Sequence, residues 1–517
     1  MAAWPGLRLR QVIQTGALLT AAHWLVACSS VGPNFQVPQQ PLPEGWQSAS
    51  LQSLPRSAPA QDTPWWTRFD DPTLAGLVDE ALRQNVTVRI AGLRILESQA
   101  QLGIVGSSLY PQLQQLSGSA LALRSRDEVQ GQHDTVSTGQ FNAGFTLGWE
   151  LDFWGKFRRS IEAADADYFA SLAKYDDIQV LMAAQVADLY VSVRTLEARL
   201  QIAHDNAAIQ KRSYEITERL YTSGNNSELD VQQAKTQYLS TLSSIPALES
   251  SLRQLQNALA ALLGRPPGPL PEMATHTGDI PAIGPDFAAH VPADVLRRRP
   301  DVRVAEMQLA AQSALIGVAE ADKYPSLSLL GAFNLSVLSL SGSPTTSTLA
   351  LGPGLTWNIF DYGRVENAVR VQDARYQQLV EQYRDTVLQA AREVDNAATA
   401  LIKGREQLAI NVEVVVAAQR ALDIATIRYR EGFSDFSRVL DAQRTYFTQN
   451  ERVVTTRSDM VLSLIALYKA LGGGWEPGRL RPLVDDATRR QMQDVTDWGG
   501  MLDQPLPLAD APSGVSN

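Results

Sequence analysis

The sequence contains little of the chemistry that enzymes use. It has one cysteine, which excludes an internal disulfide, and only five histidines among 517 residues. The four histidines beyond residue 27 stand too far apart for the spacing of a zinc site; they are His133, His204, His276 and His290. The sequence has neither a glycine-rich phosphate loop after a strand nor the turn that carries a nucleophilic serine. We therefore expect no catalytic residues, no metal and no cofactor, and we predict that the protein is not an enzyme.

The apolar stretch near the start is too short for a membrane-spanning helix, which needs about 20 residues. This stretch, Val12 to Val26, follows Arg8 and Arg10 and precedes small residues, which is typical of a secretory signal. We predict that residues 1–27 are a signal peptide. Its removal takes away two basic and no acidic residues, so the net charge falls from −10 to −12. An acidic chain argues against nucleic acid as a partner.

The single cysteine, Cys28, stands where this signal ends. The run from Leu25 to Cys28 resembles a bacterial lipobox, in which the cysteine sulfur is diacylated and the chain is cut before it. An unused thiol behind an ordinary signal peptide is the alternative. Ser29, in place of aspartate, resembles lipoproteins that are sent to the outer membrane. We predict a lipid anchor at Cys28, because several acyl chains hold a protein stably at a membrane, followed by an extended segment at 28–64.

The sequence is duplicated. Residues 81–113 resemble residues 295–327 at a shift of 214, and from Trp149 onward the shift is 208. The second shift keeps its order as far as Gly264, and two copies are fewer than a tandem array normally needs. We predict a first repeat at 65–264, a linker at 265–294, a second repeat at 295–474 and a tail at 475–517.

Each repeat contains two stretches with strand character. Apolar residues alternate with polar or small ones from Phe141 to Phe153 and again from Leu349 to Ile359. This period predicts strands with one apolar and one polar face. We expect loops at Arg126–Thr138 and Leu340–Thr348. A soluble sandwich would give the same pattern, and only the long helices that follow favour a membrane barrel.

The helices are unusually long. Residues 72–108 predict one helix, and nearly 70 residues after Gly155 and after Gly363 are free of strong breakers. Such a run would extend roughly 100 Å, whereas helices of globular proteins have about 8–20 residues. Apolar residues follow a coiled-coil seam from Val186 to Ala207 and, 208 residues later, from Val394 to Val415. A second helix should then return towards Leu263 or Leu471.

These elements imply assembly. Four strands cannot enclose a lumen, and open strand edges are not tolerated in lipid, so a barrel would be shared between protomers. Two chains would give eight strands with a filled interior, and three would give twelve with room for a passage. The fold class is therefore mixed α+β, with a coiled-coil α-helical barrel joined to a transmembrane β-barrel. Geometry favours three or more chains without choosing the number.

Several motifs resemble the outer membrane factors, the TolC-like efflux lipoproteins of the NodT type. They are Trp65-Trp66 with Asp71-Pro72, the run from Arg298 to Arg303, Tyr324-Pro325, and the strand exits at Trp149–Gly155 and Leu355–Arg364. The resemblance implies a trimer, a twelve-strand barrel in the outer membrane of a Gram-negative bacterium, and a helical tunnel through the periplasm. It also implies a membrane-fusion adaptor and an inner-membrane, commonly proton-driven, pump as partners.

The ends of the long helices are the candidate sites. In this family the periplasmic end closes where inner helices converge, with an acidic ring after the turn of the second copy. The resemblance assigns Asp441 to that ring, while Arg438 occupies its other acidic position. Asp230, at the position of Arg438 in the first repeat, and Arg428 and Tyr429 complete the predicted aperture. Solvated helix-face carboxylates are the alternative. We expect adaptor contacts at the turns, namely at Gly224, Ser227, Gly432 and Ser434.

Three functions compete. The first is a passive exit duct of a tripartite efflux system, the second a non-porous envelope scaffold, and the third a periplasmic adaptor. Duplicated strand pairs argue against the adaptor. Drug, solvent, metal and protein substrates all stay open at this point, including the alternative of protein secretion, because the pump selects the substrate.

Overall fold

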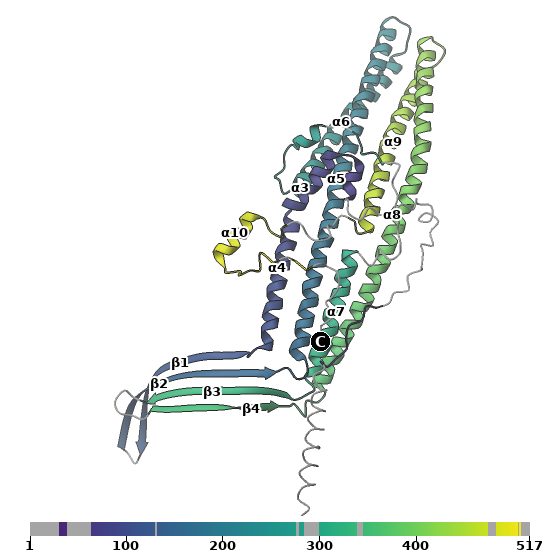
Figure 1. Ribbon diagram of the computed structural model, residues 1–517. Helices are drawn as coiled ribbons and strands as arrows, with labels where there is room; N and C mark the ends of the chain where they lie inside the picture. Colours follow the sequence, from purple (N-terminus) through teal and green to yellow (C-terminus); the bar gives the residue numbers. More distant parts are fainter. Residues whose placement is uncertain are drawn as a thin grey trace, which may run out of the picture.

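The computed structural model describes residues 30–38, 64–129, 132–275, 279–283, 299–338, 345–473, 482–504 and 506–507. The side chains of residues 125–129 and 132–136 are not included in this description. Cys28 and most of the linker lie outside the described residues. Figure 1 shows an elongated molecule, in which a long helical bundle stands on one end of a four-stranded sheet. No helix among the described residues is long and apolar enough to cross a membrane.

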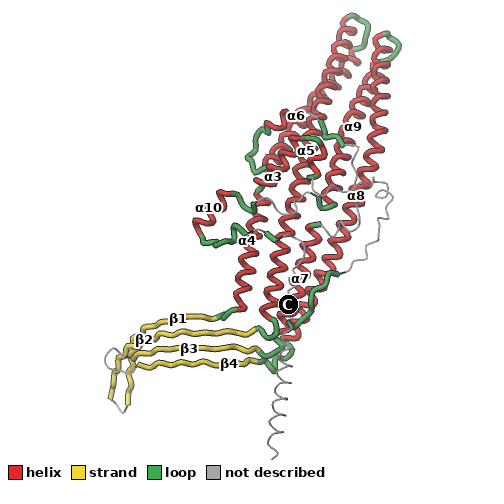
Figure 2. The backbone as a smooth tube through the Cα atoms, viewed as in Figure 1, coloured by secondary structure: helices red, strands yellow, loops and turns green. Residues whose placement is uncertain are grey.

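The long helices are confirmed. Helix α5 (Lys156–Thr222) and helix α8 (Arg364–Arg430) each have 67 residues, and the returning helices α6 (Glu228–Leu262) and α9 (Phe436–Ala470) each have 35. The two pairs form the two long arms in Figure 2. Equal lengths at the predicted shift follow from the duplication of the sequence.

The single helix expected over 72–108 is wrong. The chain forms α3 (Pro72–Gln84), α4 (Val86–Gly106) and a short 3-10 helix, η2 (Ser107–Leu109). Asn85 breaks the helix because its backbone is extended and its side chain accepts hydrogen bonds from the amides of Thr87 and Val88, at 2.8 and 3.3 Å. Asparagine is favoured at such N-caps. The counterpart of α4 in the second repeat is α7 (Pro300–Ala321).

Contacts between elements are duplicated as well. Asn85 Nδ2 donates to the carbonyl of Leu262 at 2.8 Å, and Arg299 Nη1 donates to the carbonyl of Ala470 at 2.7 Å. Both side chains thus bind a carbonyl that the end of a long hairpin leaves without an intrahelical partner. The two repeats therefore share tertiary contacts as well as helix lengths.

The sheet has the order β1-β2-β3-β4, and neighbouring strands are antiparallel. Its strands are β1 (Leu113–Val129), β2 (Gln132–Leu151), β3 (Ser326–Leu338) and β4 (Thr345–Thr356). The loop expected at Arg126–Thr138 is wrong, because the ladder continues to the pair Val129 and Gln132. The second loop is also shorter than Leu340–Thr348. Polar residues pair their backbone N–H and C=O groups in a ladder as well as apolar residues do. The polar composition of these segments therefore gave strand ends that are too early.

The sheet has one apolar and one polar face. One row across all four strands consists of Leu116, Phe145, Phe333 and Leu349, which stand opposite one another in register. All four side chains are exposed, Leu116 to 82% and Leu349 to 79%. The next row consists of Ser117, Gly144, Asn334 and Thr348. The predicted alternation is therefore confirmed, and the described residues leave the apolar face uncovered.

The core lies where α3, α5, α8 and α9 come together, and it includes the predicted seam residues Val186, Val193, Val394 and Leu401. Two short 3-10 helices, η1 (Trp65–Phe69) and η3 (Pro271–Thr275), contribute buried residues to it, among them Trp66 and Met273. The predicted tail contains a further helix, α10 (Asp486–Val495). Leu96 of α4 packs there with Val484 and Leu502, and the segment projects sideways from α4 in Figure 1.

Candidate functional site at the helical tips

Both long hairpins turn in the same way. The amide of Asn225 donates to the carbonyl of Leu220 at 2.9 Å, and 208 residues later the amide of Phe433 donates to the carbonyl of Arg428 at 2.8 Å. Gly224 and Gly432 follow the helix ends with φ of 78° and 76°. This is the Schellman arrangement, in which a left-handed residue ends the helix and glycine adopts that conformation at little cost.

The returning helices start at the next polar residues. The Ser227 hydroxyl accepts a hydrogen bond from the amide of Leu229 at 3.1 Å and so caps α6. Asp435 occupies the same position before α9 but makes no side-chain cap there. Ser434, predicted beside it, is half-buried. The turns also expose apolar side chains, since Phe433 is 74% exposed and Leu229 is 62% exposed.

A hydrogen bond joins the tips of the two repeats. Asn226 Nδ2 donates to the Tyr429 hydroxyl at 2.6 Å, between residues 203 positions apart. The Tyr429 ring packs against Phe436, with ring centroids 5.1 Å apart, and Val439 and Ala234 complete the apolar cluster. Tyr429 therefore ties the two helical hairpins of the chain together through Asn226, a partner that the sequence analysis did not identify.

Two carboxylates from different repeats, those of Asp230 and Asp435, interact electrostatically beside this bond. Burial raises the pKa of Asp230, and the negative charge of Asp435 raises it further, while a hydrogen bond from Asn226 lowers it. Burial also raises the pKa of Tyr429, and the charge of Asp230 adds to the effect. Like charges at short range favour the protonated form. The acidic pair at the tip is thus Asp230 with Asp435, a residue that the sequence analysis did not single out.

The other predicted aperture residues lie apart from this tie. Asp441 is exposed, and its carboxylate lies 3.7 Å from the guanidinium of Arg444, one turn further along α9. Arg438 and Arg428 are exposed, and neither makes an ion pair within the described residues. Arg438 and Arg444 both stand at helical spacing from Asp441, and within the described residues Asp441 pairs with Arg444.

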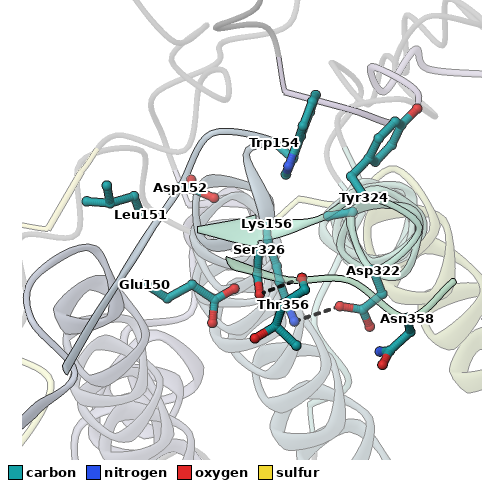
Figure 3. A pocket seen from close by; sticks show the side chains of 11 residues that line it. Glu150, Leu151, Asp152, Trp154, Lys156, Asp322, Tyr324, Ser326, Thr356 and Asn358 are labelled. Atoms are coloured by element: carbon teal, nitrogen blue, oxygen red, sulfur yellow. Dashed lines mark hydrogen bonds and ion pairs between the residues drawn. The ribbon is translucent and has the colours of Figure 1, made fainter. Parts of the chain in front are cut away.

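A second polar site lies where the strands meet the helices (Figure 3). A cavity of about 200 Å³ is lined mainly by polar side chains from both repeats. Lys156 Nζ donates to Asp322 Oδ1 at 2.7 Å, across the first turn of α5 and the end of α7. Trp154 stacks on Tyr324, with ring centroids 4.6 Å apart, and its indole donates to the carbonyl of Pro325.

Two tryptophans near the strand exits, Trp149 and Trp357, make equivalent contacts in the two repeats. The indole of Trp149 donates to the carbonyl of Leu109 at 3.1 Å, and that of Trp357 to the carbonyl of Lys323 at 3.0 Å. Trp357 is 52% exposed. An apolar ring with one bonded polar tip suits a boundary between lipid and water. Nothing in the described residues groups three or more potential metal ligands.

Known proteins resemble this chain over most of its length. The family described as "Outer membrane efflux protein" matches residues 77–265 and 291–473. "Nodulation protein T" of Rhizobium leguminosarum bv. trifolii is 31% identical, over 86% of this chain and 95% of that protein. "Probable outer membrane lipoprotein SilC" of Salmonella typhimurium is 30% identical, over 87% of this chain and 96% of that protein.

Solved structures agree. The outer-membrane channel OprN has a TM-score of 0.79 and 32% identity, over 87% of this chain and all of that one. The outer membrane protein VceC from Vibrio cholerae has a TM-score of 0.71 and 26% identity, over 80% of this chain and all of that one. The duplicated long hairpins, the four-stranded sheet and these similarities together show that the chain belongs to the outer membrane efflux protein family.

Proposed function

We propose that three copies of this chain form one passive exit duct, in which a twelve-strand barrel crosses the outer membrane and the helices make a tunnel through the periplasm. The family is one of outer-membrane efflux channels, and this protein is such a channel. The number of copies, the shared barrel and the partners belong to the proposal.

The observation that carries the proposal is a difference between duplicated positions of α5 and α8. Ala163, Val180 and Asn206 of α5 are only 4%, 4% and 5% exposed. The residues 208 positions later in α8, Val371, Leu388 and Val414, are 48%, 61% and 37% exposed. The chain therefore covers this face of the first long helix and leaves the same face of the second one open.

A second copy of the chain supplies the missing cover. Helix α7 packs on α5, and the counterpart of α7 is α4. Gly317 of α7 lies so close to α5 that an added Cβ would be 3.0 Å from Cγ of Arg159. Gly103, at the same position of α4, has nothing within 4 Å. An α4 from the next copy placed on α8 would repeat the in-chain interface around a closed ring.

The sheet leads to the same arrangement. Strands β1 and β4 are its two edges, and the apolar row on one face is exposed. Backbone groups must be paired in lipid, so β4 of one copy would pair with β1 of the next. Twelve strands leave a lumen, whereas eight are filled by side chains.

The partners follow from the family and from the tips. We propose that the exposed apolar residues Phe433 and Leu229 contact a periplasmic adaptor, which joins the duct to an inner-membrane pump. Relatives are named for cation efflux and for pyoverdine export. Such different substrates fit a duct that conducts what its pump delivers, and we propose small-molecule efflux ahead of protein secretion.

Planar-bilayer recordings of the purified protein test the duct, because a scaffold without a pore would give no conductance steps. Leu388→Arg tests the ring, since it places a charge on the face that the next copy covers. The matched control is Glu413→Arg, because the duplicated position of Glu413 in α5, Asp205, is exposed. We expect loss of the trimer for the first variant only. Trimers of normal mass in both variants would refute the ring.

A further inference from the structure

The first described residues, 30–38, lie against the foot of the helical bundle. The amide of Val31 donates to the carbonyl of Trp154 at 3.0 Å, where β2 leads into α5. The Arg159 side chain, only 5% exposed, donates to the carbonyls of Val31 and Gly32 at 3.1 and 3.2 Å. It also donates to Asn34 Oδ1 at 2.8 Å, and Glu162 accepts its remaining hydrogen bond at 2.7 Å.

The recess around this segment is built from glycines. Gly32 has a φ of 92°, and a Cβ added to it would clash with Cα of Gly317. A Cβ added to Gly317 would lie 2.7 Å from the carbonyl oxygen of Val31. A Cβ added to Gly155 would lie 2.5 Å from the Ser30 hydroxyl oxygen. Because ordinary atoms do not approach so closely, the fit depends on the absence of side chains at three positions.

An apolar side chain completes the contact. Phe35 packs against the buried residues of α7 and α8, and against a second cluster that includes α5; these residues are Val302, Leu309, Val380, Tyr383 and Val387, then Ala166, Ala310 and Ala311. Helix α5 belongs to the first repeat, and α7 and α8 belong to the second. The segment therefore fastens the two repeats to each other.

The duplicated position lacks this recess. Asn367 replaces Arg159, and its side-chain oxygen accepts a hydrogen bond from Arg370 instead. The counterpart of Gly317 is Gly103, which has open space around it. A buried arginine that binds three acceptors of one segment is thus specific to the junction that the N-terminal segment occupies.

We propose that Arg159 locks the lipid anchor, so that the acyl chains of Cys28 enter the membrane at a fixed place beside the foot of the barrel. This inference rests on the acylation of Cys28 proposed from the sequence. Ser30 lies two positions after Cys28, so the chain between them can span about 7 Å. The segment 30–38 is therefore held against the foot of the helical bundle, and Arg159 is its positioning residue.

Hydrogen exchange of residues 31–36 in the purified, full-length mature protein tests the lock. Arg159→Gln removes charged hydrogen bonds, and we expect exchange of the Val31 amide to become roughly tenfold to a hundredfold faster. Gly317→Val fills the recess and should have the same effect, whereas Arg159→Lys should be intermediate. The control, Arg370→Gln, changes an exposed arginine of α8 and should leave the exchange unchanged.

Protection of α5 and α9 in the same experiment shows that a variant is folded. Unchanged exchange of residues 31–36 in both folded Arg159→Gln and folded Gly317→Val would overturn the lock. Mass spectrometry of the mature N-terminus separates the two ideas. A free Cys28 thiol would overturn the lipid anchor. The exchange rates test the Arg159 lock whether or not Cys28 is acylated.

Discussion

Replacing Tyr429 by phenylalanine should loosen the closed end of the duct. The substitution removes the hydroxyl that accepts a hydrogen bond from Asn226 at 2.6 Å. It keeps the ring, so the contact with Phe436 at 5.1 Å and the apolar cluster of the tip stay in place. The change is therefore confined to one link between the two repeats.

The size of the effect follows from this link. A neutral hydrogen bond contributes about 1 kcal/mol net, which would change an opening equilibrium about fivefold in one chain. If three chains open together, the change is about 3 kcal/mol, or more than a hundredfold. We therefore expect Tyr429→Phe to raise the single-channel conductance, or the time that the channel spends in a high-conductance state.

The chain offers a matched control for this measurement. Tyr221 is the duplicated counterpart of Tyr429, it is 44% exposed, and its hydroxyl makes no hydrogen bond within the described residues. Single-channel recordings in planar bilayers should show a change for Tyr429→Phe and none for Tyr221→Phe. Equal conductance of both variants and the unchanged protein would mean that this tie does not hold the aperture. Arg438→Ser should add little to this effect, because Arg438 makes no ion pair within the described residues.

Four further outcomes can be measured. Mass spectrometry should find an acylated Cys28, and Cys28→Ser should lose the anchor while the barrel still inserts; a mature end elsewhere in the chain would contradict the lipoprotein assignment. In that background, single cysteines at Gln132 or Thr345 should react with an impermeant thiol reagent on whole cells, whereas labelling only after the outer membrane is broken would reverse the topology. Asp441→Ala should reduce cation preference, since carboxylates attract cations, and unchanged selectivity would make Asp441 an ordinary surface residue. Burial raises the pKa of Asp188 to about 6. Because the pKa in the folded state exceeds that in the unfolded state, ionisation of Asp188 lowers the free energy of unfolding. The full stability is present below about pH 4 and is lost as the pH rises through 6. At pH 7.5, Asp188→Asn should therefore raise the free energy of unfolding by up to about 3 kcal/mol, seen as a higher Tm, and at pH 4 it should have little effect. Equal Tm shifts at both pH values would show that Asp188 does not titrate in this way.

Periodicity and repetition were sufficient to predict the architecture. Helix length depends on the absence of breakers between Gly155 and Gly224, and strand faces depend on alternation, so both are properties of neighbouring residues. The break at Asn85 was also encoded locally, since asparagine before a helix is a capping signal. The strand ends were missed because polar residues can pair in a ladder as readily as apolar ones.

The sequence by itself thus determined the duplication, the long hairpins, the four strands and the family. Only the tertiary structure decided which side chains meet, because the partners are far apart in the chain. Asn226 lies 203 residues from Tyr429, and Arg159 lies 125 residues from Asn34. At the tip, Asp441 had two arginines at helical spacing, and its contact with Arg444 was decided by side-chain conformation. Local rules place residues on faces of elements, but the packing of the elements selects the pairs.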